Sequence, residues 1–342
     1  MVELNGKKIL VTFLMHLGDL TLTTPFIHAL RKAAPDAHIT MLVDEKLKDV
    51  VLFNPYLDEV VTIDKKGRDN SILSLWACSR HLSKLDFDVL INLHPNERCS
   101  FIDAMTSVKL RTGTTHKIFK WFWDVFTPLD RSMHAADMYL DVLQQLGVQD
   151  LSNNGLEIFP GEEHFLEAEL FWQEQNITDQ DKLIGFNIGS AVPTKRWPPE
   201  RFAEVADIFA AKGYKTVFFG GPMDEEMVAE ATGYMQTRPI IATGHFAIGG
   251  LAAAMRRCCL IITNDSGPMH VAISQKVPIV AMYGPSNPKL YGPYTKDAVI
   301  VTAQPPCQGC ADGMKHSCED LQCMTRMTVK QVVAAADTML DK

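Results

Sequence analysis

The sequence predicts an α/β protein made of two open, doubly wound domains in tandem. Its 342 residues are enough for two domains of ordinary size. Short apolar runs alternate with helical patterns almost from end to end, which is typical of βα units wound around parallel sheets. A cluster of turn-forming residues near position 160 separates two such series.

The first series predicts an N-terminal domain over residues 1–160. Its expected strands are the apolar runs at 9–14, 39–43, 60–63 and 89–93. Its expected helices lie near 24–34, 72–83 and 135–146. Short apolar runs bounded by turn formers are typical of strands buried in a parallel sheet.

The second series predicts a C-terminal domain over residues 161–342. Its expected strands lie at 183–188, 216–219, 239–242, 260–263, 278–283 and 298–301, with helices between them. The segment 151–163 carries Ser152-Asn153-Asn154-Gly155 and Pro160-Gly161, which favour a linker with its boundary near Pro160. In this architecture a ligand is expected outside the carboxyl ends of the strands.

Composition excludes several classes of protein. Hydrophobic residues make up 46% and charged residues 22%, as in ordinary globular proteins. The net charge of −8 gives no general attraction for nucleic acid. The longest uncharged stretch, 239–255, is interrupted by glycines and is too short to span a membrane. No secretion signal is expected, so the protein is predicted to be cytoplasmic, with its cysteines as thiols or metal ligands.

Several common motifs are absent. No glycine pair has the Gly-x-Gly spacing, so a dinucleotide fingerprint cannot form. A P-loop, a His-Glu-x-x-His pair and a Gly-x-Ser-x-Gly elbow are missing as well. The carboxylates of Asp86-Phe87-Asp88 precede a strand, whereas ligand sites of this architecture follow strands.

The first strand runs into Met15-His16-Leu17-Gly18-Asp19. Gly18 permits a tight turn, and Asp19 then stands at the start of a helical segment. A carboxylate there could accept the proton of an attacking hydroxyl, a contribution of about 10² to 10⁴ in rate. Capping of the helix is the structural alternative for Asp19.

The first strand of the second domain leads into a loop with candidate phosphate ligands. Ser190 and Thr194 offer hydroxyl groups and Lys195 an ammonium group before a helix that starts near Pro198-Pro199. An ordinary loop with a solvated Lys-Arg pair is an equally simple interpretation.

A further strand is followed by Asn264-Asp265-Ser266-Gly267-Pro268-Met269-His270, which opens a helix. Amides at a helix start suit a phosphate, and Ser266 and Gly267 allow close approach of the backbone. Asp265 suits sugar hydroxyls or the amides of its own loop. His270 could face a phosphate or fill the interior. The loop Tyr283-Gly284-Pro285-Ser286 follows at the same sheet edge.

Four cysteines, Cys307, Cys310, Cys318 and Cys323, have the spacing Cys-x2-Cys-x7-Cys-x4-Cys. The first pair is spaced like half of a zinc or iron site, although the second pair is irregular. A structural zinc or iron, free thiols and a disulfide-stapled loop all remain open.

Taken together, these motifs resemble one family. Gly18-Asp19 with Thr24-Pro25, Lys195-Arg196-Trp197-Pro198, the segment 264–270 and Tyr283-Gly284-Pro285 are similar, in order and spacing, to the ADP-heptose:lipopolysaccharide heptosyltransferases, glycosyltransferase family 9. The resemblance implies a GT-B fold, in which two Rossmann-like domains face a central cleft. The C-terminal domain would bind the donor, and the last helix, expected at about 328–340, would tend to pack back on the N-terminal domain.

The resemblance also implies roles for these residues. Asp19 would be the general base and Lys195 would neutralise the departing diphosphate, in an inverting transfer that needs no cofactor and no catalytic metal. The expected donor-binding residues are Gly18, Ser190, Thr194, Lys195, Asp265, Ser266, Gly267 and His270.

The expected substrates are ADP-heptose and the inner core of lipopolysaccharide or a lipid A precursor, with peripheral contact at the inner face of the cytoplasmic membrane. An anionic acceptor requires a basic patch, and Lys65, Lys66 and Arg68 follow the third strand. The aromatic stretch 119–123 could touch the membrane interface or belong to a core helix. Transfer to a protein or another glycan, and a nucleotide-sugar binding module without turnover, are the alternatives.

Overall fold

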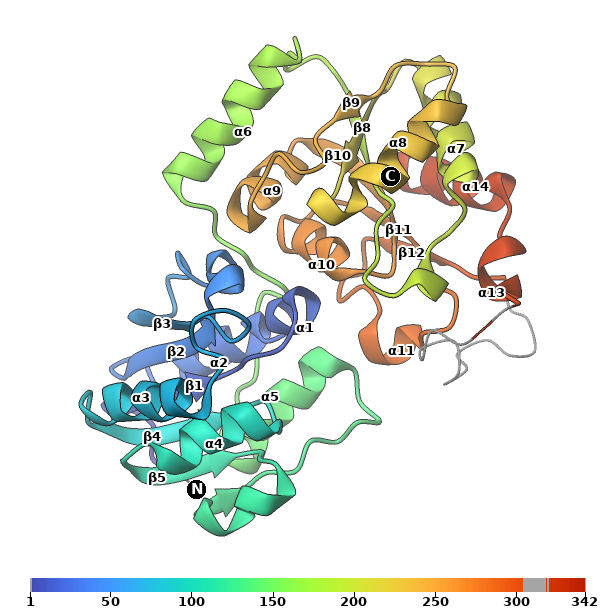
Figure 1. The fold of residues 1–342 in the computed structure, drawn as a ribbon. Helices are drawn as coiled ribbons and strands as arrows, with labels where there is room; N and C mark the ends of the chain where they lie inside the picture. Colours follow the sequence, from blue (N-terminus) through green and yellow to red (C-terminus); the bar gives the residue numbers. More distant parts are fainter. Residues whose placement is uncertain (1, 304–317, 319, 342) are drawn as a thin grey trace. The chain divides into compact units, whose positions relative to one another are not determined.

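The computed structural model describes residues 2–303, 318 and 320–341 (Figure 1). It divides the chain into two compact units, Met1–Phe159 and Pro160–Lys342. Each unit contains a parallel sheet of six strands. The predicted α/β class with two doubly wound sheets is therefore confirmed.

The N-terminal sheet has the order β3-β2-β1-β4-β5-β6, and every pair of neighbours is parallel. Its strands are β1 (Lys8–Thr12), β2 (His38–Asp44), β3 (Glu59–Ile63), β4 (Phe87–Asn92), β5 (Val108–Gly113) and β6 (Val125–Phe126). Its helical segments are α1 (Leu17–Thr21), α2 (Thr24–Ala33), η1 (Glu45–Val50), α3 (Ile72–Ser83), α4 (Glu97–Met105), η2 (Lys117–Phe122) and α5 (Ala135–Gln145).

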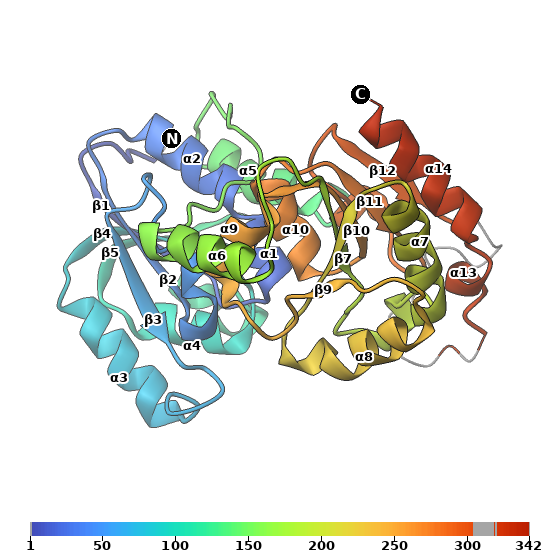
Figure 2. The same ribbon diagram turned by 90° about the horizontal axis from the view of Figure 1, so that it is seen from above.

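Helices cover both faces of this sheet. Helices α2 and α5 pack together on one face, and α3 and α4 on the other (Figure 2). Strand β1 is buried on both sides, with Leu10 facing the core under α3 and α4. Its position between β2 and β4 makes the gap between β1 and β4 the place where the strand order reverses.

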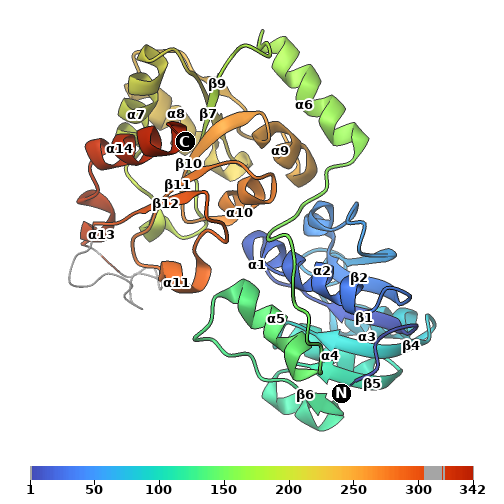
Figure 3. The same ribbon diagram turned by 180° about the vertical axis from the view of Figure 1, so that it is seen from behind.

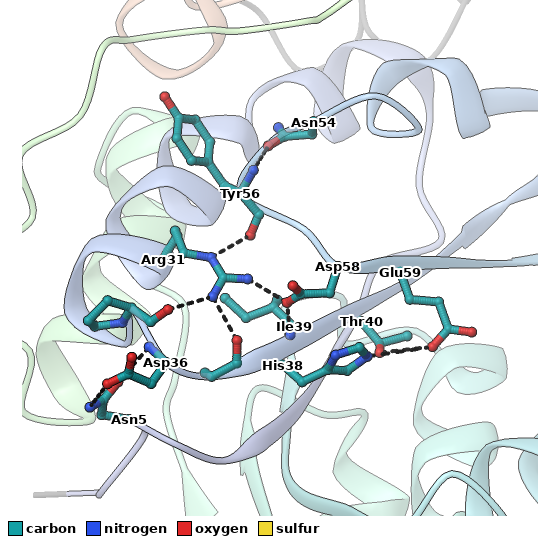
Figure 4. Close-up of polar contacts among 12 residues, drawn as sticks. Asn5, Arg31, Asp36, His38, Ile39, Thr40, Asn54, Tyr56, Asp58 and Glu59 are labelled. Atoms are coloured by element: carbon teal, nitrogen blue, oxygen red, sulfur yellow. Dashed lines mark hydrogen bonds and ion pairs between the residues drawn. The ribbon is translucent and has the colours of Figure 1, made fainter.

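One arginine ties three elements of this unit together. The guanidinium of Arg31, on α2, donates to the carbonyl oxygens of Tyr56 (3.1 Å) and Ala37 (2.7 Å) and to the carboxylate of Asp58 (Figure 4). The same carboxylate accepts from the amide of Ile39 on β2 at 2.7 Å. The end of α2 is thereby fixed to the loops that enter β2 and β3.

The C-terminal sheet has the order β12-β11-β10-β7-β8-β9 and is also parallel. Its strands are β7 (Leu183–Asn187), β8 (Lys215–Phe219), β9 (Ile240–Ile241), β10 (Cys258–Asn264), β11 (Ile279–Met282) and β12 (Ala298–Val301). Its helical segments are α6 (Glu162–Glu174), η3 (Pro193–Lys195), α7 (Pro199–Ala211), η4 (Pro222–Asp224), α8 (Glu225–Tyr234), α9 (Ile248–Met255), α10 (Gly267–Ser274), α11 (Pro288–Tyr291), α13 (Gln322–Thr325) and α14 (Val329–Leu340).

The last helix belongs to the C-terminal core. Helix α14 packs against α7 and against β10, β11 and β12 (Figure 3). Its buried residues Val332, Ala336 and Met339 share a cluster with Trp197. Thr328 and Gln331 form a capping box that fixes its start. The buried face of α14 is thus used within its own unit, and the expected packing on the N-terminal domain stays a prediction.

Candidate active site

The C-terminal unit gathers polar side chains where its strand order reverses, between β7 and β10. Asn187 ends β7, and its amide donates to Thr263 Oγ1 (2.9 Å) and to Ser266 Oγ (2.8 Å). Asn264 ends β10, and its amide donates to the carbonyl of Ile188 (2.6 Å). Because these bonds cross between adjacent strands, both loops are held at one sheet edge.

An ion pair lies on this edge. Lys195 Nζ is 2.7 Å from Asp265 Oδ2, and both side chains are largely buried. Ser286, from the loop after β11, donates its hydroxyl to the same carboxylate oxygen. The hydroxyl of Ser190 donates to the carbonyl of Asp265 at 3.3 Å. Residues that are far apart in the sequence therefore converge on Asp265.

The loop that carries Lys195 is anchored in the core. Trp197 is fully buried, and its indole donates to the carbonyl of Met327 at 3.1 Å. Its amide donates to Asn264 Oδ1 at 3.0 Å. The Arg196 guanidinium donates to the carbonyl of Ser190 at 2.9 Å. These bonds set the position of Lys195 before any ligand arrives.

Helix α10 starts at the same edge. Ser266 occupies the N-cap position, but its side chain does not cap the helix and instead accepts from Asn187. The amides of the first turn carry partial positive charge, which suits a phosphate group. His270 is buried one turn into the helix. Together with Lys195, this helix start can hold a diphosphate.

The structure adds an acidic residue that the sequence motifs missed. Asp224, at the end of η4 after β8, is buried and accepts from the amide of Gly221 at 2.9 Å. A Cβ atom at Gly189 would lie only 2.2 Å from Asp224 Oδ1. The signal available in the sequence was Gly220-Gly221 directly after an apolar run, which marks a close approach of the backbone at a strand end.

In the N-terminal unit, Gly18 and Asp19 lie in α1, directly after β1. Asp19 is half-buried in the first turn, and the N-cap position belongs to His16. His94 follows β4 on the other side of the strand reversal and is buried. Burial, together with the nearby charge of Lys65, lowers the pKa of His94 to about 4, so this imidazole is neutral at pH 7.

The basic patch expected after β3 differs from the prediction. Lys65 is buried, and its ammonium donates to the carbonyls of Leu14 (2.7 Å) and Met15 (2.8 Å) and pairs with Asp44 (3.1 Å). Lys66 and Arg68 are exposed, and Arg68 pairs with Glu45 at 2.9 Å. Lys65 thus joins residues at or just after the ends of three strands. A buried ammonium group needs such hydrogen-bond and ion-pair partners.

Comparison with known proteins identifies the family. The model of glycosyltransferase family 9 (heptosyltransferase) matches residues 75–319, which is more than half of the chain. The chain belongs to glycosyltransferase family 9. It is therefore a glycosyltransferase, as the resemblance implied.

Solved structures and curated relatives agree with this assignment. A family 9 glycosyl transferase from Veillonella parvula DSM 2008 is 53% identical with a TM-score of 0.95, over 99% of this chain and 98% of that one. The Escherichia coli ADP-heptose lps heptosyltransferase II is 21% identical with a TM-score of 0.80, over 97% and 98% of the two chains, and shares the α/β fold. The curated lipopolysaccharide heptosyltransferase 3 of E. coli K12 is 24% identical over 82% of this chain and 84% of its own.

The cysteine segment of this family 9 chain is described only in part. Cys307 and Cys310 lie outside the described residues, whereas Cys318 is half-buried and Cys323 is buried. Within residues 2–303, 318 and 320–341, no three His, Cys, Asp or Glu side chains are grouped as a metal site. In the same part of the chain, no helix is long and apolar enough to cross a bilayer. The metal prediction for the four cysteines stays a prediction.

Proposed function

We propose that this enzyme transfers a heptose from ADP-heptose to the inner core of lipopolysaccharide. The observation that carries the proposal is the buried Lys195–Asp265 pair beside the start of α10, in a chain that belongs to the heptosyltransferase family. A fixed ammonium group and helix amides are the groups that a nucleoside diphosphate requires. E. coli relatives whose names include ADP-heptose or lipopolysaccharide support both substrates.

In the proposed donor site, Lys195 and the amides of Ser266 and Gly267 receive the diphosphate. Ser190 and Thr194, both buried near this loop, offer hydroxyl groups. Asp265 keeps the hydrogen bond from Ser286 when Lys195 turns toward a phosphate oxygen. As the bond between C1 and the diphosphate breaks, negative charge grows on ADP, and these fixed donors stabilise it.

In the proposed acceptor step, Asp19 takes the proton of the attacking hydroxyl. The acceptor oxygen bonds to C1 on the face opposite the diphosphate, so the anomeric configuration inverts. No metal ion is needed, because Lys195 and the helix amides supply the positive charge that the leaving group requires. Exposed Lys66 and Arg68 are proposed contacts for anionic groups of the acceptor.

The test is release of ADP from ADP-heptose with lipid A cores truncated before the first or the second heptose. We expect turnover with one core, in the presence of EDTA, and inverted configuration in the product. Asp19→Asn should lower kcat by about 10² to 10⁴ and leave ADP affinity unchanged. Release without any acceptor core, or full activity of Asp19→Asn, would contradict the proposal.

The donor site has a separate test in ADP binding measured by titration calorimetry. Lys195→Met should weaken ADP binding by roughly tenfold or more, because it removes a charge-assisted contact and leaves the Asp265 carboxylate unpaired near the phosphates. Lys330→Met, an exposed change on α14, is the matched control. Equal affinities for the two variants would remove Lys195 from the donor site. Tight ADP binding without turnover on any core would redirect the search to protein or other glycan acceptors.

A further inference from the structure

The segment η2, residues Lys117–Phe122, exposes apolar side chains next to cations. Trp121 is 95% exposed, and Ile118 and Phe122 are 58% and 45% exposed. Such large apolar groups seldom gather on the surface of a soluble protein unless they bind something. Lys117 and Lys120 are exposed within the same segment.

This exposure is built into the fold. The ring of Phe119 points inward and packs edge-on against Phe101 of α4, with ring centroids 6.3 Å apart. Trp123 is buried, and its indole donates to the carbonyl of Thr112 on β5 at 3.0 Å. The amide of His116 donates to Ser100 Oγ at 2.8 Å. Two inward aromatic side chains thus anchor the segment while Trp121 points outward.

The segment lies at the edge of the sheet that carries Asp19. It begins four residues after β5 ends at Gly113, and β6 then pairs with the last residues of β5 (Figure 3). Because all strands of this sheet are parallel, the carboxyl end of β5 shares an edge with the carboxyl end of β1, which leads to Asp19. A second exposed apolar group, Leu73 and Trp76, lies near the start of α3, on the helix that packs against α4.

We infer that η2 is an interfacial anchor that inserts Trp121, Ile118 and Phe122 into an anionic lipid bilayer. Charge complementarity favours this partner, because Lys117 and Lys120 stand beside the apolar tip although the whole chain carries a net charge of −8. Tryptophan next to lysine is typical of the membrane interface. The anchor deepens the proposed function, since a lipid-linked acceptor would then meet the sheet edge that carries Asp19.

The experiment measures binding of the full chain to vesicles of 70% phosphatidylcholine and 30% phosphatidylglycerol by co-sedimentation. Trp121→Ser should lower the partition coefficient by roughly tenfold, because it removes a large apolar side chain from the interface. Lys117→Gln should lower it by about fivefold. The controls on other surfaces are Leu166→Ser on α6, where Leu166 is 58% exposed like Ile118, and Lys330→Gln on α14. Both controls should bind as the unmodified chain does.

Two results would overturn the proposed membrane anchor. One is vesicle binding that Trp121→Ser leaves unchanged. The other is a dimer in sedimentation velocity that Trp121→Ser dissociates, which would assign this surface to contact with a second copy of the chain. Thermal melting verifies that each variant is folded. Activity on a water-soluble core oligosaccharide separates the two proposals. If the anchor alone is wrong, this activity persists without vesicle binding; if the proposed function alone is wrong, vesicle binding persists without heptosyl transfer.

Discussion

The buried carboxyl group of Asp103 should make the protein less stable as the pH rises. Asp103 lies on α4 and has no exposed surface. Thr12 Oγ1 donates to its Oδ2 at 2.8 Å, whereas Oδ1 has no hydrogen-bond partner among the residues that the structure describes. Burial raises the pKa of this carboxyl group from 3.8 to about 8, against weaker opposing effects of the hydrogen bonds from Thr12 and Cys99.

The sign and size of the effect follow from proton linkage. The folded protein keeps this proton up to about pH 8, whereas the unfolded chain loses it near pH 3.8. Stability from this group is therefore complete below that lower value and is lost progressively as the pH rises toward about 8. Each pH unit inside the window costs about 1.4 kcal/mol, so the loss between pH 5 and pH 7 is about 3 kcal/mol.

The assay compares urea unfolding of the unmodified chain and of Asp103→Asn at pH 5, 6 and 7, followed by circular dichroism. Asparagine has no charge to bury, so the stability of the variant relative to the unmodified chain should rise by about 3 kcal/mol over this range. With an m value of about 2 kcal/mol/M, the relative midpoint moves by about 1.5 M urea. Asp130→Asn is the control, because hydrogen bonds from Ser132 lower the pKa of this exposed carboxyl group. Its effect on stability should therefore not change between pH 5 and pH 7. A stability difference for Asp103→Asn that stays constant or falls with pH would refute the reasoning.

Two further substitutions have close controls in the sequence. Gly189→Ala places a Cβ atom 2.2 Å from the carboxylate of Asp224 and should lower the free energy of unfolding by about 1 to 3 kcal/mol. In the control Gly221→Ala, the added Cβ atom would meet no heavy atom within 4 Å, so the melting temperature should not change. Calorimetric melting decides this, and equal melting temperatures would contradict the contact. Lys65→Met leaves a buried carboxylate unpaired and should cost about 3 to 5 kcal/mol. The matched control Lys66→Met, at an exposed position, should cost almost nothing. Similar urea midpoints for the two variants would contradict the burial of the Lys65 ion pair.

Local sequence patterns predicted most strands and helices. They missed elements in which charged or polar residues interrupt the apolar pattern. The predicted helix at 72–83 matches α3, and the predicted first strand at 9–14 overlaps β1. Strand β5 was missed because Lys109 and Arg111 interrupt its apolar residues. The strand tolerates these charges because it lies near the edge of the sheet and is only partly buried. Helix α4 was missed because its buried face includes the polar residues Ser100 and Asp103.

The candidate site was predicted residue by residue, but its pairings were not. Asp19 and Lys195 were proposed because each follows an apolar run at a strand end, and their roles stay predictions. The contact of Lys195 with Asp265 joins residues 70 positions apart, and its geometry depends on the pairing of β7 with β10. Lys65 was predicted to be an acceptor contact in a basic patch, but it is buried, and its partners are distant in the sequence. Nothing near it in the sequence indicates that Leu14, Met15 and Asp44 surround its ammonium group.

In the proposed mechanism, the pairing of Lys195 with Asp265 keeps the donor site ordered before the donor binds. A lone buried ammonium group would be costly, and Asp265 offsets part of that cost while holding Lys195 beside the start of α10. A diphosphate bound as proposed would compete with this carboxylate, so part of the attraction between Lys195 and phosphate would be offset in the ground state. As the leaving group gains charge, its attraction for Lys195 grows while that of Asp265 does not. On the proposed mechanism, the pair would therefore favour the transition state over the bound donor, which is the condition for raising kcat rather than affinity.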